Sequence, residues 1–333
     1  MQNEFRTVVN IKRFDLSIDV GSEVLLLGSC FSDHIGARFV DSRLKAVVNP
    51  FGVVYNPWSI ARLLERTMNL ELCEEDELIL HNEHWHHFDF HGVFSGADKT
   101  DVSKKINQTL ENTHEILGRT DYLVLTFGTS YVYERVDTSG IVANCHKMPT
   151  GFFSRYRLEP DEIVALYKEL IVSLRMFNPG LKILFTVSPV RHWKDGAHGN
   201  QLSKSVLFLG INKLVELFDG VEYFPAFEIV MDELRDYRFY DPGMFNPSEQ
   251  AVDYIWRRLV DSLFSNDAQK FISLASKIAK ARKHRIVDPA ASESLTFIRK
   301  SIELIENIKL QFPQADLDSD HLYFKNLLFK VEK

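Results

Sequence analysis

The chain has 333 residues, a formal net charge of -7 and 45% hydrophobic residues, which is the composition of a globular protein with a sizeable core. The acidic balance argues against a nucleic-acid-binding surface, and without a long apolar run we expect neither a signal peptide nor a membrane span. Three cysteines are too few for a disulfide framework, so we expect a reduced, cytoplasmic protein with free thiols.

Short apolar runs alternate with helical patterns over the first 260 or so residues. The apolar runs predict strands at residues 23–28, 45–50, 121–128, 182–189 and 221–227. The patterns between them predict helices at residues 32–42, 57–70, 102–118, 160–177 and 201–218. Strands that are apolar on both faces and separated by helices form parallel sheets covered on both sides. The sequence therefore predicts an α/β fold, a three-layer doubly wound parallel sheet of about five strands.

Two insertions have the pattern of β-hairpins. One covers residues 78–95, and the other covers residues 131–147 with its turn at 138–140. We expect both to be antiparallel additions to the parallel sheet.

The last part of the chain has a different pattern of apolar and polar residues. Residues 266–285 and 294–312 carry apolar side chains three and four positions apart, which predicts amphipathic helices. We therefore divide the chain into a domain at residues 1–261 and a C-terminal helical appendage at residues 262–333. Its basic stretch, 277–285, is interpreted as a solvated helix face, and the appendage is a candidate surface for self-association.

The first apolar run ends in an unusual turn, Gly28-Ser29-Cys30, just before a predicted helix. In doubly wound sheets, ligands bind beyond the carboxyl ends of the strands. A thiol at a helix start has a lowered pKa and is a candidate nucleophile, whereas a serine there needs a neighbouring base. The alternative is that Ser29 caps the helix and Cys30 packs as a small apolar group.

Seven short motifs change the balance between these alternatives. They are FRT (5–7), GSCFS (28–32), NPFGVVYNP (49–57), FGTSYVY (127–133), NCHK (144–147), SPVRH (188–192) and YRFY (237–240). In this order, from about residue 3 to 260, the chain resembles the GSCFA family, which in turn resembles the SGNH (GDSL-like) hydrolases. The resemblance implies hydrolysis or transfer of an ester-linked acyl group of a small-molecule substrate, without a cofactor.

The resemblance also implies roles for particular residues. The Gly-Asp-Ser turn of SGNH hydrolases aligns its nucleophile with Cys30, and Ser29 is the rival nucleophile. A glycine of the second block donates to the oxyanion hole, which corresponds here to Gly52. The third block, Gly-x-Asn-Asp, corresponds to Gly128 and the residues after it, with Ser130 at the asparagine position. An oxyanion hole is therefore expected around Gly52, Gly128 and Ser130.

The general base of the SGNH hydrolases has no counterpart in this sequence. Their Asp-x-x-His pair aligns with Gly243 and Asn246, neither of which titrates. Either the activity is lost or another histidine transfers the proton. The candidates are His146, His198 with Asp195 three residues before it, and His192, which we rank third. Each of them is also compatible with an ordinary loop histidine.

A histidine-rich stretch, HNEHWHHFDFHG, lies in the first insertion. Read as a strand, it places Trp85, His87, Asp89 and His91 on one face. Two histidines and a carboxylate are a known metal set, but neighbours on one strand rarely converge on one ion. We therefore favour a polar strand beside the cleft, with His91 contacting substrate and no metal, and keep a metal-dependent hydrolase as an alternative.

The remaining candidates are substrate contacts. Arg191 and Lys204 could hold an anionic substrate group, unless they pair with Asp195 or Glu228. The candidates for substrate binding are Asn49, Asn56, His91, Arg191 and His192. Because a fold does not entail an activity, a catalytically degenerate binding module on the same scaffold is the main alternative function.

Overall fold

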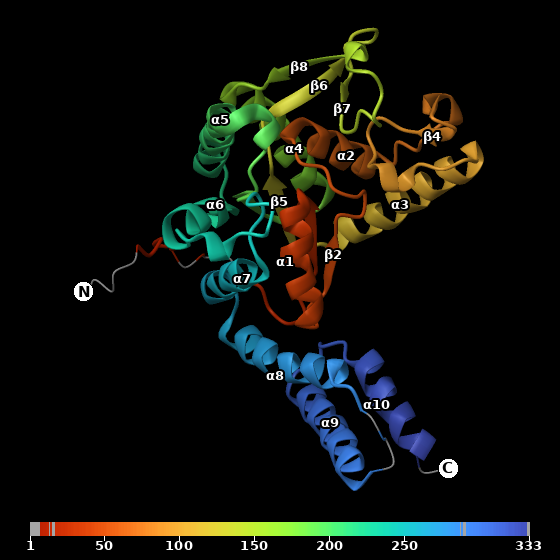
Figure 1. Ribbon diagram of the computed structural model, residues 1–333, viewed down its shortest axis with the longest axis vertical. Coiled ribbons are helices and arrows are strands. Elements are labelled where there is room, and N and C mark those ends of the chain that lie inside the picture. The colour runs from red at the N-terminus through yellow and green to blue at the C-terminus, as the bar shows by residue number, and fades with distance from the viewer. Residues whose placement is uncertain (1–6, 13, 15–16, 287, 289–290, 332–333) are drawn as a thin grey trace.

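The computed structural model describes residues 7–12, 14, 17–286, 288 and 291–331, and a five-stranded sheet lies at its centre (Figure 1). The strands of this sheet are β1 (Val24–Gly28), β2 (Ala46–Val48), β5 (Tyr122–Phe127), β9 (Lys182–Val187) and β10 (Val221–Phe224). All neighbouring strands are parallel, in the order β10-β9-β5-β1-β2. The five predicted strands are thus confirmed, and the direction of the strand order reverses between β1 and β5.

Helices cover both faces of the sheet. The helices on one face are α2 (Pro57–Asn69), α3 (Lys99–Arg119), α4 (Pro160–Phe177) and α5 (Gly196–Leu217), and those on the other are α1 (Cys30–Asp41) and α7 (Glu249–Leu263). Alternate strand residues point to opposite faces. Accordingly, Leu25 and Leu27 of β1 belong to the first apolar core, while Val24 and Leu26 belong to the second. The predicted three-layer fold is confirmed.

The two insertions form small antiparallel sheets above the main one. The first pairs β3 (Ile79–His81) with β4 (His84–His86), and the second has the order β7-β6-β8, with β6 (Tyr131–Arg135), β7 (Ile141–Val142) and β8 (Phe153–Arg157). The sequence pattern did not predict β8. Short helical turns complete the chain: η1 (Glu75–Glu77), η2 (Gly92–Phe94), η3 (Thr150–Phe152), η4 (Trp193–Asp195), α6 (Ala226–Glu228), η5 (Ile229–Glu233) and η6 (Tyr237–Phe239).

The histidine-rich stretch is not one continuous strand, so that part of the sequence interpretation is wrong. Strand β4 ends at His86, and the chain then turns, because the Phe90 N–H donates to the carbonyl of His87 (3.2 Å). The Asp89 N–H also donates to Nδ1 of His87 (3.0 Å). A local turn thus replaces the alternation that would have aligned His87, Asp89 and His91 on one face.

The C-terminal helices extend from the α/β body on the side of α1 and α7 (Figure 1). They are α8 (Asn266–Lys283), α9 (Ser292–Gln311) and α10 (Asp318–Val331), of which the sequence pattern predicted only the first two. Their buried side chains, including Phe271 and Phe324, continue the apolar core that contains Phe39 of α1. None of the helices in the described ranges combines the length and hydropathy needed to cross a bilayer. Of the FRT motif, only Thr7 lies within the described residues.

Candidate functional site

Cys30 lies where β1 passes into α1, beside the point at which the strand order reverses. Ser29 is 3% exposed and its Oγ accepts the N–H of Phe31 (3.2 Å), so it caps the helix as the capping interpretation expects. Cys30 is half-buried and is the first residue of α1. The turn therefore leaves the thiol, and not the hydroxyl, as the accessible nucleophilic group.

Gly28 determines how closely this turn approaches the neighbouring strand. Its φ of 145° is rarely adopted by L side chains. A Cβ added there would lie 2.8 Å from Cβ of Thr126, with the carbonyl oxygen of Thr126 closer still. The close approach places Cys30 at the adjoining ends of β1 and β5.

Asn49 and Asn56 hold the loops of the site, although the sequence suggested that they bind substrate. The Asn49 side chain accepts the N–H of Gly28 (2.9 Å) and donates to Asp33 (2.6 Å). The Asn56 side chain caps α2 by accepting the N–H of Ser59 (2.8 Å). Both asparagines are buried, so their side-chain hydrogen bonds serve the protein itself.

The environment of the Cys30 thiol opposes ionisation. Burial and the negative charge of Asp33 raise the pKa of the thiol, against the opposing effects of the N–H groups of Cys30 and Phe31 and the positive charge of Lys204. The expectation of a lowered pKa at a helix start is therefore wrong, because burial outweighs the helix terminus. A thiol that is protonated at neutral pH needs a base before it can attack.

Lys204 is fully buried and reaches the ends of two central strands. It extends from α5, and its Nζ donates to the carbonyls of Gly128 (2.6 Å) and Ser188 (2.7 Å), at the ends of β5 and β9. Burial lowers the pKa of Lys204 to about 7, an effect that Cys30 opposes and Arg191 reinforces. An amine that titrates near neutrality thus interacts electrostatically with the Cys30 thiol.

The sequence contained a signal that Lys204 is buried, which the motifs did not reveal. The lysine lies three and seven positions before Leu207 and Ile211, on the buried face of α5. A charged residue on the apolar face of a helix is rarely buried without a specific partner. The sequence analysis treated it only as an anion-binding candidate.

Among the candidate histidines, His192 lies closest to the ends of β5 and β9. Its ring packs on Tyr55 with 5.4 Å between centroids, and its Nε2 lies 3.2 Å from where a Cβ on Gly128 would stand. Burial and the positive charge of Lys204 lower the pKa of His192 to about 4, while Asp195 opposes the shift. His192 is therefore an uncharged imidazole at neutral pH.

The two histidines that were ranked above His192 have other surroundings. His146 is buried in the second insertion, where its Nε2 lies 2.8 Å from the carbonyl of His87 and its ring stacks on His86. Burial lowers the pKa of His146 to about 4. His198 is exposed, and Asp195 pairs with Arg155 instead of with it. Among the described residues, no imidazole hydrogen-bonds to the Cys30 sulfur.

The residues expected to form the oxyanion hole make hydrogen bonds within the protein. The Gly52 N–H donates to the carbonyl of Asn49 (2.8 Å), and the Gly128 N–H donates to that of Tyr55 (2.7 Å). Ser130 is fully buried and its Oγ bonds Ser203 (3.1 Å). Of the two N–H groups beside the sulfur, that of Phe31 donates to Ser29, so that of Cys30 is the donor that remains.

The segment that aligns with the missing acid–base pair does lie beside the loop after β9. The N–H of Arg191 donates to the carbonyl of Phe245 (3.2 Å), which joins the two loops. Within the segment, the Asn246 amide donates to Asp241 (2.9 Å). An amide bonded to a carboxylate thus stands at the position where the resemblance to SGNH hydrolases would place an imidazole.

Arg191 presents an unpaired positive charge near Lys204. Its guanidinium donates to the sulfur of Met231 (3.2 Å), and no carboxylate within the described ranges pairs with it. The expected alternative partners are occupied, since Asp195 pairs with Arg155 and Glu228 accepts the hydroxyl of Tyr223. Half-buried and without an acidic partner, Arg191 is suited to hold an anionic group.

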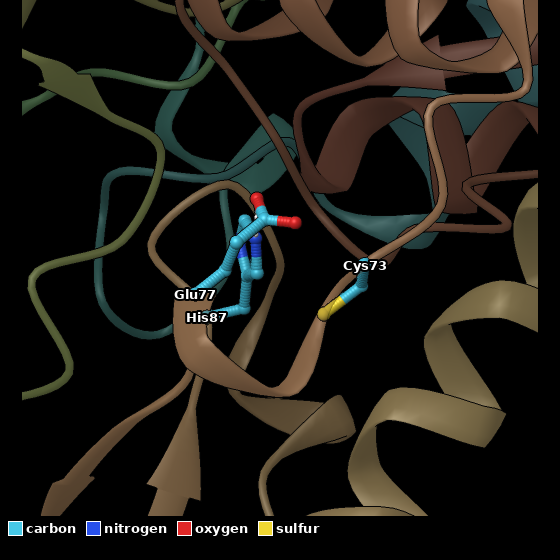
Figure 2. Close-up of side chains that lie close together, drawn as sticks. All are labelled: Cys73, Glu77 and His87. Carbon is cyan, nitrogen blue, oxygen red and sulfur yellow. Dashed lines mark hydrogen bonds and ion pairs between the residues drawn. The ribbon is translucent and has the colours of Figure 1, made fainter.

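The histidine-rich insertion contains a compact cluster, but not the one that was considered. Cys73, Glu77 and His87 place ligand atoms within 4.8 Å of one another, with the Glu77 carboxylate beside the His87 ring (Figure 2). The Arg66 guanidinium already occupies this place, 2.8 Å from Glu77 and 3.3 Å from Nε2 of His87. Burial also raises the pKa of Cys73 to about 12. A buried cation and a protonated thiol make the cluster an ion-pair network that does not fit a metal.

His91 lies apart from this network. Its Cβ would be 2.5 Å from a Cβ on Gly52, so the imidazole packs against the turn that follows β2. Its Nδ1 accepts the N–H of Val93 (3.3 Å), which caps a short helical turn. His91 therefore packs beside Gly52, which has a positive φ of 75°.

The fold is thus a doubly wound α/β sheet with a thiol at the point where the strand order reverses. The sequence model of the GSCFA family matches residues 23–259, and the chain belongs to this family. None of the curated proteins matches the chain. Among solved structures, it is similar to an acetyl xylan esterase (Est2A) from the rumen bacterium Butyrivibrio proteoclasticus, at 13% identity and a TM-score of 0.37. That match covers 73% of this chain and 63% of the esterase, less than two thirds of its length.

Proposed function

We propose that this protein hydrolyses or transfers the acyl group of a small-molecule ester, with Cys30 as the nucleophile. The observation that carries the proposal is the position of the Cys30 thiol, half-buried at the start of α1, directly after β1 and beside β5. Ligands of doubly wound sheets bind at this place. Membership of the GSCFA family is consistent with the proposal.

The reaction needs two half-steps. A base removes the Cys30 proton, the sulfur attacks the acyl carbon, and the alcohol leaves with that proton, which produces a thioester. Water or a second alcohol then attacks the thioester and restores the thiol. The Cys30 N–H at the start of α1 offers partial positive charge to the oxyanion, and Arg191 offers a contact for an anionic substituent.

The test compares the turnover of a panel of activated esters by the wild-type protein and by three variants, Cys30→Ala, Cys145→Ala and Ser29→Ala. Cys30→Ala should lower kcat/KM by about 100-fold or more, because the covalent route is removed. Cys145→Ala is the matched control, since Cys145 is also a half-buried free thiol, and it should retain activity. Ser29→Ala should stay active while losing about 1 kcal/mol of stability with the helix cap. Activity that survives in Cys30→Ala but disappears in Ser29→Ala would reassign the nucleophile.

A second candidate function is a binding module for an anionic metabolite. Two features favour it: Gly243 and Asn246 replace the acid–base pair, and the N–H groups of Gly52 and Gly128 are engaged internally. In that case no ester is turned over, but a carboxylate or phosphate compound raises the melting temperature. Arg191→Met should abolish that increase, because it removes the unpaired guanidinium. Ester turnover that depends on Cys30 would exclude this candidate.

A further inference from the structure

We propose that a cavity between α5 and the edge strand β10 binds a small organic ammonium ion with a short apolar tail, and that Glu228 holds the charged nitrogen. The cavity lies at the β10 edge of the main sheet, whereas Cys30 lies where the strand order reverses between β1 and β5. The site therefore goes beyond the proposed function and does not depend on it.

One face of α5 forms a wall of the cavity. Four side chains spaced three and four positions apart on this helix line it: Phe208, Ile211, Asn212 and Val215. Across from them lie Tyr223 of β10 and Glu228 of α6, and the rings of Phe208 and Tyr223 meet edge to face with 6.3 Å between centroids. Asn212 is exposed, so the cavity reaches the surface.

The size of the cavity fits a small molecule. Its volume is about 220 Å³. An engineered apolar cavity of about 150 Å³ in another protein binds benzene. The cavity beside β10 therefore has room for a ring and a short chain that ends in a polar group.

Glu228 brings a carboxylate into this cavity without a cation beside it. Tyr223 donates its hydroxyl to both carboxylate oxygens, at 2.7 and 3.0 Å, which fixes the orientation of the group. Within the described ranges, no lysine, arginine or histidine pairs with Glu228. Because a carboxylate has about four acceptor positions, it can accept further hydrogen bonds beside the Tyr223 hydroxyl.

The groups around Glu228 leave its negative charge uncompensated. Burial raises the pKa of Glu228, an effect that the Tyr223 hydroxyl opposes and the negative charge of Asp232 on η5 reinforces. The α5 side chains that line the cavity carry no charge. A ligand cation would supply the missing positive charge, since an ammonium group donates to a carboxylate and is attracted to aromatic rings. The apolar side chains of α5 would cover its tail.

Calorimetric titration of the full chain with 2-phenylethylamine and with 2-phenylethanol tests the charge requirement. The two probes have nearly the same shape, but at about pH 8 the amine is an ammonium ion and the alcohol is neutral. We expect the amine to bind about tenfold or more tightly than the alcohol, because a hydrogen bond to a charged group is stronger. Methylammonium lacks the apolar tail and should bind about tenfold or more weakly than 2-phenylethylamine.

The pH dependence of amine binding follows from the protonation of Glu228. As the pH falls, the carboxylate is neutralised while the ligand stays an ammonium ion, so the affinity should decrease. Because the pKa of Glu228 is raised, the decrease should begin above the pH at which an ordinary glutamate titrates. The affinity of the alcohol should not follow this change.

Three variants locate the site. Glu228→Gln should reduce the affinity for the amine to that for the alcohol, and Val215→Phe, which fills the cavity, should abolish binding of both. Glu216→Gln is the matched control and should bind the amine like the wild type. It removes an exposed carboxylate of α5 that accepts the Asn212 amide (2.9 Å) but does not line the cavity.

The wild-type protein alone can overturn the proposal. Equal affinities for the amine and the alcohol, or no binding of either at about 10 mM, would do so without any variant. Amine binding that survives Glu228→Gln or Val215→Phe would also overturn it, as would an equal loss of affinity in Glu216→Gln. None of these measurements uses an ester or Cys30, so their failure leaves the proposed hydrolysis untouched.

Discussion

Substitution of Gly28 by alanine should disrupt the turn that positions Cys30. Gly28 combines a positive φ of 145° with a close approach to Thr126 of the neighbouring strand. An added Cβ would stand 2.8 Å from the Thr126 side chain and closer to its backbone carbonyl, so β1 and β5 would have to separate. Backbone cannot rotate away as a flexible side chain can, and the clash therefore falls on the sheet itself.

The expected loss of stability in Gly28→Ala is the sum of two free-energy costs. Placing a side chain at a disfavoured φ costs about 1–3 kcal/mol, and overpacking a tight interior costs about the same, for a total of roughly 3–5 kcal/mol. With an unfolding entropy of about 2.1 cal/mol/K per residue, this corresponds to a melting temperature lower by about 4–7 °C. Alkylation of Cys30 at neutral pH should change as well, because the thiol shares the turn.

The assay compares melting temperature and Cys30 alkylation in Gly28→Ala with those in Gly118→Ala. The control glycine lies in α3, and a Cβ there would meet only Phe177 at 3.8 Å, which is ordinary contact. Alanine should therefore stabilise that helix by about 0.5–1 kcal/mol. If Gly28→Ala melts no lower than Gly118→Ala and its Cys30 reacts at the wild-type rate, the described turn geometry is refuted.

Three further outcomes are expected. Asp320→Ala should lower the free energy of unfolding by about 3 kcal/mol in urea titrations, because the carboxylate is fully buried between two arginines, whereas exposed Asp318→Ala should have no measurable effect. The arginines hold the pKa of Asp320 below its usual range despite burial. The carboxylate therefore contributes to the free energy of unfolding above the unfolded pKa of about 4, and this contribution is lost as the pH falls through the lower folded value. Equal effects of the substitution at about pH 7 and pH 3 would contradict this. Treatment with EDTA should leave the melting temperature unchanged, because the Arg66 guanidinium already contacts Glu77 and His87 of the Cys73 cluster, and a drop would reveal a structural metal. Asn246→His, which places an imidazole beside Asp241, should raise ester turnover on the order of tenfold relative to Asn246→Gln; equal turnover would show that this segment no longer serves the reaction.

The sequence was sufficient to predict the layers of the fold. Each main strand is apolar on both faces, and the helices between them have one apolar side, so the pattern has few other solutions. The turn at Cys30 was found for the same reason, because it directly follows the first such strand. The alternation of side chains along a short segment was a less reliable guide to strands. Residues 87–91 were interpreted as a strand, but hydrogen bonds from Asp89 and Phe90 close a turn there.

The electrostatics of the site could not be predicted from motifs. Whether the Gly52 and Gly128 N–H groups are free depends on which carbonyls the folded loops bring to them, here those of Asn49 and Tyr55. The pKa of Cys30 likewise depends on burial by segments distant in sequence, which outweighs the local effect of the helix start.

The most direct test of the account is to locate the acyl group after brief exposure to an activated acetyl ester. Acid quenching and peptide mapping by mass spectrometry report which side chain carries the acetyl group. We predict a thioester on Cys30 that forms much faster than any modification of Cys73, which is 3% exposed and whose pKa is raised to about 12. An acetyl group on Ser29, or a Cys30 that is acylated no faster than Cys73, would contradict the assignment of Cys30 as the nucleophile.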